Sequence, residues 1–129
     1  MMGGNIYFDK TKVMAIIRIK DLLVRTYIGF NPDEVKNKQD VIINMTIHVD
    51  VSGAVEKDQI EGAYNYKSIT KSVFHMVQDG HFSLLETLTQ RILDLIMSDN
   101  NVKYAKVEVD KPHALRFAQS VSVEMEQSR

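Results

Sequence analysis

The alternation of apolar and polar residues along the chain predicts four β-strands. It is clearest over Gln39–Val51, where apolar and polar residues take turns with few exceptions. Successive side chains of a strand point to opposite faces, so this alternation places one apolar row against a core. Similar patterns predict strands over residues 13–27, 104–109 and 120–126, the first with a kink near Lys20–Asp21. Two strands are therefore expected near each end of the chain.

Between these pairs of strands the apolar spacing changes to that of α-helices. Over residues 66–77 and again over 84–97, apolar residues recur three or four positions apart, which predicts two amphipathic helices. Ser83 and Glu86 have the spacing of a capping box, in which both side chains satisfy backbone N–H groups at the start of a helix.

The order strand, strand, helix, helix, strand, strand predicts an α+β domain. We expect a four-stranded antiparallel sheet with two helices on one face (β-β-α-α-β-β), built by a single domain over residues 13–129. Residues 1–12, with two adjacent glycines, are expected to form a flexible tail. Long exposed sheet edges are hazardous for a monomer, so a ring-shaped homo-oligomer that closes a barrel is expected.

Composition narrows the classes of function. The 129 residues include no cysteine, which excludes disulfides, thiolate metal sites and cysteine nucleophiles. The formal net charge of −1 argues against a nucleic-acid partner. No apolar run has the length of a membrane span, and no signal peptide is evident, so a cytoplasmic location without membrane contact is expected. The histidines show no metal-ligand spacing, and no metal is expected.

One segment near the C-terminal end carries candidate chemistry. Lys111 ends a predicted strand, Pro112 follows it, and His113 and Arg116 come within the next four residues. A lysine held by a stiff neighbour can transfer protons, and an arginine suits an anionic substrate because its guanidinium binds phosphate oxygens in pairs. The alternative for each is a solvated surface residue. For Glu86, the alternative to binding a ligand is the capping role.

Four segments together resemble the dihydroneopterin aldolase family. They are Tyr-Ile-Gly-Phe-Asn-Pro-Asp-Glu at 27–34, Tyr-Asn-Tyr-Lys-Ser-Ile at 64–69, Phe-Ser-Leu-Leu-Glu at 82–86 and Val-Asp-Lys-Pro-His-Ala-Leu-Arg at 109–116. The resemblance runs from about residue 16 to residue 126. It implies the tunnelling fold, a pterin substrate, no cofactor, and a homo-oligomer, an octamer of two tetrameric rings.

The resemblance also implies roles for individual residues. Glu86 would anchor the pterin, because a carboxylate accepts two neighbouring N–H groups of the ring, and backbone groups of Leu85 would add contacts. Lys111 would move protons, and Tyr66 would reach the site from a neighbouring subunit. Glu34 would lie beside the substrate side chain, with Asp33 as the alternative if the match slips by one residue.

Within the family, two features favour the epimerases. One is Arg-Thr-x-Ile-Gly at 25–29, followed by a glutamate and then by Gln-Asp at 39–40; the other is His-Ala-Leu-Arg after Lys111-Pro112. The expected reaction inverts C2′ of dihydroneopterin triphosphate by retro-aldol and aldol steps, with Arg116 and His113 as candidates for binding the triphosphate. The alternatives are an aldolase that releases glycolaldehyde and 6-hydroxymethyl-dihydropterin, and a non-catalytic oligomeric pterin-binding module.

Overall fold

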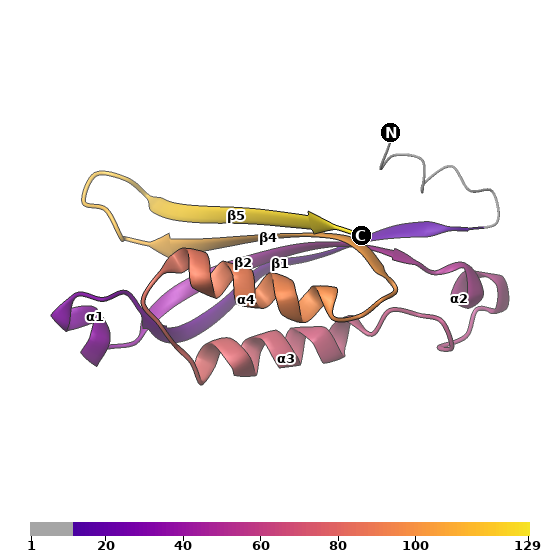
Figure 1. Ribbon diagram of the computed structural model, residues 1–129, viewed down its shortest axis with the longest axis horizontal. Helices are drawn as coiled ribbons and strands as arrows, with labels where there is room; N and C mark the ends of the chain where they lie inside the picture. The colour runs from indigo at the N-terminus through magenta and orange to yellow at the C-terminus, as the bar shows by residue number, and fades with distance from the viewer. Residues whose placement is uncertain (1–11) are drawn as a thin grey trace.

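The computed structural model describes residues 12–129, and its central element is a curled mixed sheet. Four long strands pair in antiparallel fashion: β1 (Met14–Ile28), β2 (Gln39–Asp50), β4 (Val102–Pro112) and β5 (Ser120–Ser128). The helices α3 (Tyr66–Gln78) and α4 (Leu85–Met97) both cover the same face of this sheet (Figure 1). The expected α+β architecture is confirmed, while the expected tail lies outside the described residues except for Lys12.

The expected number of strands was wrong by one. The sheet has five strands in the order β3-β1-β2-β4-β5, because β3 (His81–Phe82) pairs in parallel with Tyr27 and Ile28 at the end of β1. Two residues are too few to show any alternation, so no periodicity predicts this strand. Two short helices were also not predicted, α1 (Pro32–Lys36) and α2 (Ser52–Lys57).

The core lies between the sheet and the two long helices. The apolar row of β2 is buried as expected, since Val41, Ile43 and Ile47 are all fully shielded from solvent. From α4, Leu88 and Ile92 are also fully buried against it. Each such side chain stabilises the fold by about 1.5–3 kcal/mol relative to leaving it exposed. The sheet is thereby a stiff platform from whose ends loops can present polar groups.

The predicted kink in β1 is a β-bulge. The pairing of β1 with β2 shifts between Ile19 and Leu22, and Asp21 has a left-handed backbone with a φ of 55°. An aspartate tolerates this conformation, and the Asp21 N–H donates to Asn44 Oδ1 at 2.9 Å. The bulge is therefore a built feature of the strand, held from β2.

The predicted capping box at the start of α4 was wrong. The N-cap is Leu84, with an extended backbone and no side-chain cap, so Ser83 lies one residue too early to cap the helix. Glu86 is consequently the second residue of the helix, in its first turn. The capping role that competed with ligand binding is thus absent.

No helix within residues 12–129 is long and apolar enough to cross a membrane.

Candidate active site

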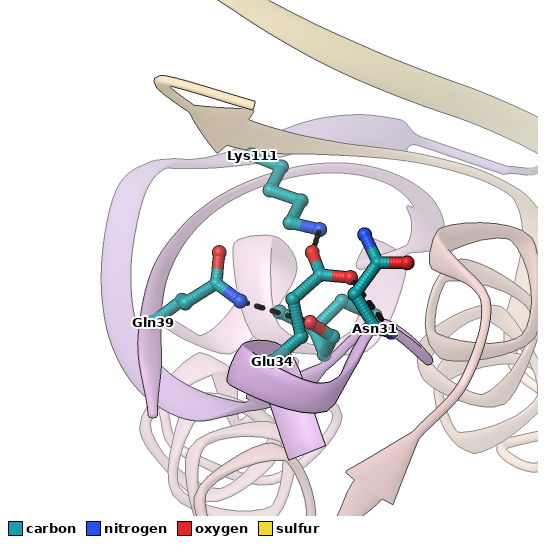
Figure 2. A network of polar contacts seen from close by, with 5 residues as sticks. Asn31, Glu34, Gln39 and Lys111 are labelled. Carbon is teal, nitrogen blue, oxygen red and sulfur yellow. Dashed lines mark hydrogen bonds and ion pairs between the residues drawn. The ribbon is translucent and has the colours of Figure 1, made fainter. Parts of the chain in front are cut away.

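The ion pair between Lys111 and Glu34 is the centre of the candidate site. Lys111 lies near the end of β4 and Glu34 in α1, and Lys111 Nζ donates a hydrogen bond to Glu34 Oε2 (Figure 2). The side chains retain only 14% and 20% of their exposure, respectively. Of the two candidate carboxylates, Glu34 is therefore the one that pairs with Lys111, and the adjacent Asp33 is exposed.

The turn after β1 makes room for the Glu34 carboxylate. Gly29 has a φ of 118°, and a Cβ added there would lie 2.2 Å from the Cδ of Glu34. The backbone N–H of Gly29 donates to the Phe82 carbonyl oxygen at 2.8 Å, which ties the turn to β3. Only glycine combines this backbone conformation with such a close approach. On the other side, the Asn31 N–H donates to Glu34 Oε1 at 3.3 Å.

Gln39 completes this network and was not among the predicted site residues. Its Nε2 donates to the carbonyl oxygen of Ile28 at 3.1 Å (Figure 2), and hydrogen bonding by its side chain also lowers the pKa of Glu34. Gln39 is the first residue of β2, so its amide reaches back over the turn. The sequence signal for Gln39 is the Gln-Asp pair five residues after Glu34, which indicates the family but not this hydrogen bond.

Electrostatics keep Glu34 charged. The hydrogen bond from Lys111 is the largest influence and lowers the pKa of Glu34 below its usual value of 4.5, although burial acts in the opposite direction. The Asn31 N–H and the positive charge of Lys111 lower this pKa further. At neutral pH the site thus holds a carboxylate in contact with the lysine amine, an arrangement that can receive and return a proton.

Glu86 lies at the same end of the molecule as this pair. α4 begins, β4 ends and α1 lies at one end of the long axis (Figure 1). Glu86 is exposed, and among residues 12–129 its carboxylate makes no hydrogen bond or ion pair. Leu85 before it is half-buried against the core, which fixes the start of the helix. The carboxylate is therefore positioned and available for a ligand.

Tyr66 lies at the other end of the molecule. It is the first residue of α3, and α3 begins beside the α2 end of the sheet, opposite the end where β4 finishes (Figure 1). Its side chain is 54% exposed and lines an open hollow of about 790 Å³. Within this one chain the structure does not bring Tyr66 to Lys111.

Arg116 and His113 occupy the turn between β4 and β5. Both are exposed, and the Arg116 guanidinium carbon lies 5.5 Å from the centre of the Phe117 ring. The His113 backbone is left-handed, with a φ of 61°, and its N–H donates to the Gln119 carbonyl oxygen at 3.3 Å. The turn follows Lys111 directly, yet neither side chain makes a hydrogen bond or an ion pair with Lys111 or Glu34. Among residues 12–129, no three histidine, aspartate or glutamate side chains gather into a metal-binding group.

Known proteins resemble this chain over most of its length. A family model described as dihydroneopterin aldolase matches residues 17–126. A dihydroneopterin triphosphate 2′-epimerase of Pseudomonas aeruginosa is 56% identical over 110 residues, covering 85% of this chain and 89% of that protein. An Escherichia coli protein of the same name is 47% identical over 115 residues, covering 89% of this chain and 96% of that protein.

A solved structure gives the same fold. A Vibrio cholerae crystal structure, assigned as a dihydroneopterin aldolase, superposes with a TM-score of 0.85 at 27% identity, covering 91% of this chain and 99% of the other. The resemblance that the four sequence segments carried is therefore confirmed, and with it the tunnelling fold. The matching family model, the sequence identity to its members and the shared fold together show that the chain belongs to the dihydroneopterin aldolase family.

Proposed function

We propose that the protein is an enzyme that epimerises dihydroneopterin triphosphate at C2′. The relatives named above as epimerases, at 56% and 47% identity, favour this reaction over release of the fragment. The observation that carries the proposal is the half-buried pair of Lys111 and Glu34 at the same end of the molecule as the unpaired Glu86. A non-catalytic binding module would not need a shielded lysine in contact with a carboxylate.

The proposed reaction needs only proton transfers around one carbon–carbon bond. A base removes the proton of the C2′ hydroxyl, the C1′–C2′ bond breaks, and its electron pair enters the imine of the dihydropterin ring. The two-carbon aldehyde, which carries the triphosphate, turns over and is attacked on its other face. The bond forms again, C2′ regains its hydroxyl proton, and its configuration is inverted. Lys111 would move the proton and Tyr66 would assist, while Glu34 would hold the hydroxyls and a water.

In this proposal Glu86 fixes the pterin ring, with Leu85 adding backbone contacts. The carboxylate would accept two N–H groups of the ring, and such charge-assisted pairs are about twice as strong as neutral ones. Arg116 and His113 would approach the triphosphate from the turn that follows Lys111. No cofactor is required, since the ring itself accepts the electrons.

We also propose that the working form is a homo-oligomer, an octamer of two tetrameric rings. Two observations support assembly. Within residues 12–129 the outer edge of β5 has no partner, and β1 pairs with β3 only at Tyr27 and Ile28, so both edges have free backbone groups. In addition, Tyr66 and Lys111 lie at opposite ends of one protomer. Joining the sheet edges of neighbouring copies would pair these free backbone groups. The same assembly would bring Tyr66 of one copy to Lys111 of another.

Product analysis tests the reaction. The protein is incubated with dihydroneopterin triphosphate and, separately, with dihydroneopterin, and the products are separated. The expected result is the C2′ epimer from the triphosphate. Accumulation of 6-hydroxymethyl-dihydropterin in place of the epimer would establish the aldolase instead, and no turnover of either compound would refute both. Analytical centrifugation tests the assembly, and a monomer at micromolar concentration would contradict it.

A further inference from the structure

The start of α3 concentrates positive charge beside Tyr66. The same hollow of about 790 Å³ that Tyr66 lines is also lined by Lys67 and Lys71, together with Asn65, Ser68 and Thr70. Both lysines are exposed. Residues four apart lie on one face of a helix, so Lys67 and Lys71 project side by side. Neither lysine was a candidate in the sequence, because each resembles an ordinary solvated residue of a helix surface.

The stability of α3 does not account for these lysines. Within residues 12–129 neither amine makes a hydrogen bond or an ion pair. Lys67 is the second residue of the helix, whose first turn contains no acidic residue, although the positive end of the helix dipole favours acidic side chains there. Like charges four residues apart add a further cost of about 0.2–0.5 kcal/mol. A bound anion would relieve both costs.

The proposed reaction brings an anion to this place. In the proposed reaction, Tyr66 acts where the bond between C1′ and C2′ breaks. The triphosphate is attached to C3′, the carbon next to C2′. A triphosphate bound beside Tyr66 would therefore extend along the surface around that residue. At about 1.5 Å of rise per residue, Lys71 lies about 7.5 Å beyond Tyr66 along the helix axis, so the two lysines line a path rather than a point.

We propose that Lys67 and Lys71 bind the triphosphate of a substrate whose pterin is held by a neighbouring copy of the chain. This inference rests on the proposed function, because it requires Tyr66 to act in the neighbour's site. Lysine suits the role, since its three donors can follow the oxygens of a flexible polyphosphate. Arg116 from the neighbour's turn would contact the same group from the other side. The lysines would thus determine the preference for phosphorylated over unphosphorylated substrate.

The test compares three proteins with the wild type: Lys67→Gln, Lys71→Gln, and the double variant. The control is Lys57→Gln, which removes the same charge from the last turn of the neighbouring short helix α2, outside the hollow. The Michaelis constant and turnover number are measured with dihydroneopterin triphosphate and with unphosphorylated dihydroneopterin. Each lysine is expected to contribute on the order of tenfold in the Michaelis constant for the triphosphate, as is usual for hydrogen bonds to charged groups. The Michaelis constant for the unphosphorylated compound should stay the same in all three variants. In the Lys57→Gln protein, the constants for both substrates should stay the same.

Melting temperatures separate binding from folding. Because the lysines repel each other and the helix dipole, the variants should melt at the wild-type temperature or slightly above it. An unchanged Michaelis constant for the triphosphate in the double variant would overturn the proposal, as would an equal rise for both substrates. If the wild type turns over neither compound, titration with inorganic triphosphate in a calorimeter decides. Saturable binding that the double variant loses and Lys57→Gln retains would support the lysine site, and any other result would refute it.

Discussion

The two ends of the sheet carry polar groups in opposite states. Where β4 finishes, Lys111 and Glu34 are half-buried, paired, and held by Asn31 and a glycine turn. Where α3 begins, Tyr66 is exposed and Lys67 is without a partner among residues 12–129. At the first end, Lys111 and Glu34 find each other within one chain. At the second end, these side chains have no partner among the described residues, which is what the proposed site shared between copies would require.

The largest expected effect is at the end where β4 finishes. Replacing Lys111 by alanine should lower the turnover number by about 10²–10⁴-fold, because a general acid–base group contributes this much. Binding of the pterin should survive, since Glu86 remains. Lys106→Ala is the matched control, because Lys106 belongs to the same strand and its ion pair with Glu124 is loose at 3.9 Å. Steady-state kinetics measure the loss, and near-full activity of Lys111→Ala would refute the mechanism.

Mixing two defective chains tests whether the ends cooperate. Tyr66→Phe and Lys111→Ala proteins should each be impaired, but their co-expression should restore activity if each site takes its tyrosine and lysine from different copies. With random assembly, about a quarter of the sites would combine two intact residues. Activity of the purified mixed oligomer is compared with that of the separate proteins. Activity no higher than their average would show that both residues serve the same chain's site.

A smaller effect is expected at Glu86. Glu86→Gln should weaken pterin binding by about 2–4 kcal/mol, because a charge-assisted bidentate contact is lost. The melting temperature should barely change, since Glu86 has no hydrogen-bonding partner among residues 12–129. Glu61→Gln, another exposed carboxylate, serves as the control. Titration with neopterin measures the affinity. Lowered stability with unchanged binding would mean that Glu86 is a helix residue only.

Arg116 should distinguish the substrates by about tenfold. Arg116→Ala removes the guanidinium from the turn after β4 and should raise the Michaelis constant for dihydroneopterin triphosphate by that amount. The constant for unphosphorylated dihydroneopterin should remain the same. Lys57→Ala, which removes a positive charge from the last turn of α2 at the other end of the sheet, is the control. Equal changes for both substrates would show that the turn does not bind the triphosphate.

The smallest expected effect is on stability in acid. Lys111 lowers the pKa of Glu34, so this pair stabilises the fold at pH values above the unfolded carboxyl's 4.5. The contribution is lost as the pH falls through the lower folded value. Melting temperatures recorded from neutral pH downward should therefore fall more steeply for the wild type than for Glu34→Gln. Asp50, whose pKa is lowered by hydrogen bonds from Ser52, is present in both proteins and cancels in the comparison. Parallel curves would mean that the pair adds no stability.

The sequence predicted what depends on near neighbours in the chain. The apolar row of β2 and the two long helices follow from local periodicity, and the structure confirms them. The pairing of Lys111 with Glu34 was beyond this reasoning, because the residues are 77 positions apart and meet only when the sheet forms. Glu34 entered the predicted site through the family resemblance alone.

Two misses have local physical causes. The capping box failed because the extended backbone of Leu84, with a ψ of 141°, starts the helix one residue later than the Ser83–Glu86 spacing implied. Gln39 was missed because an amide at the first position of a strand has no pattern of its own. Its role appears only through the carbonyl oxygen of Ile28, which the preceding turn brings within 3.1 Å.

The bulge at Asp21 sets the phase of the strand that leads to the site. Before it, the inward-facing residues of β1 are odd-numbered, such as Ile17 and Ile19; after it they are even-numbered, ending in Val24, Thr26 and Ile28. In an unbroken ladder, one half of the strand would have to turn its apolar side chains to solvent. The extra residue thus reverses which alternate side chains of β1 face the core. It lets one strand bury both halves and still deliver the glycine turn to the Glu34 carboxylate in the correct orientation.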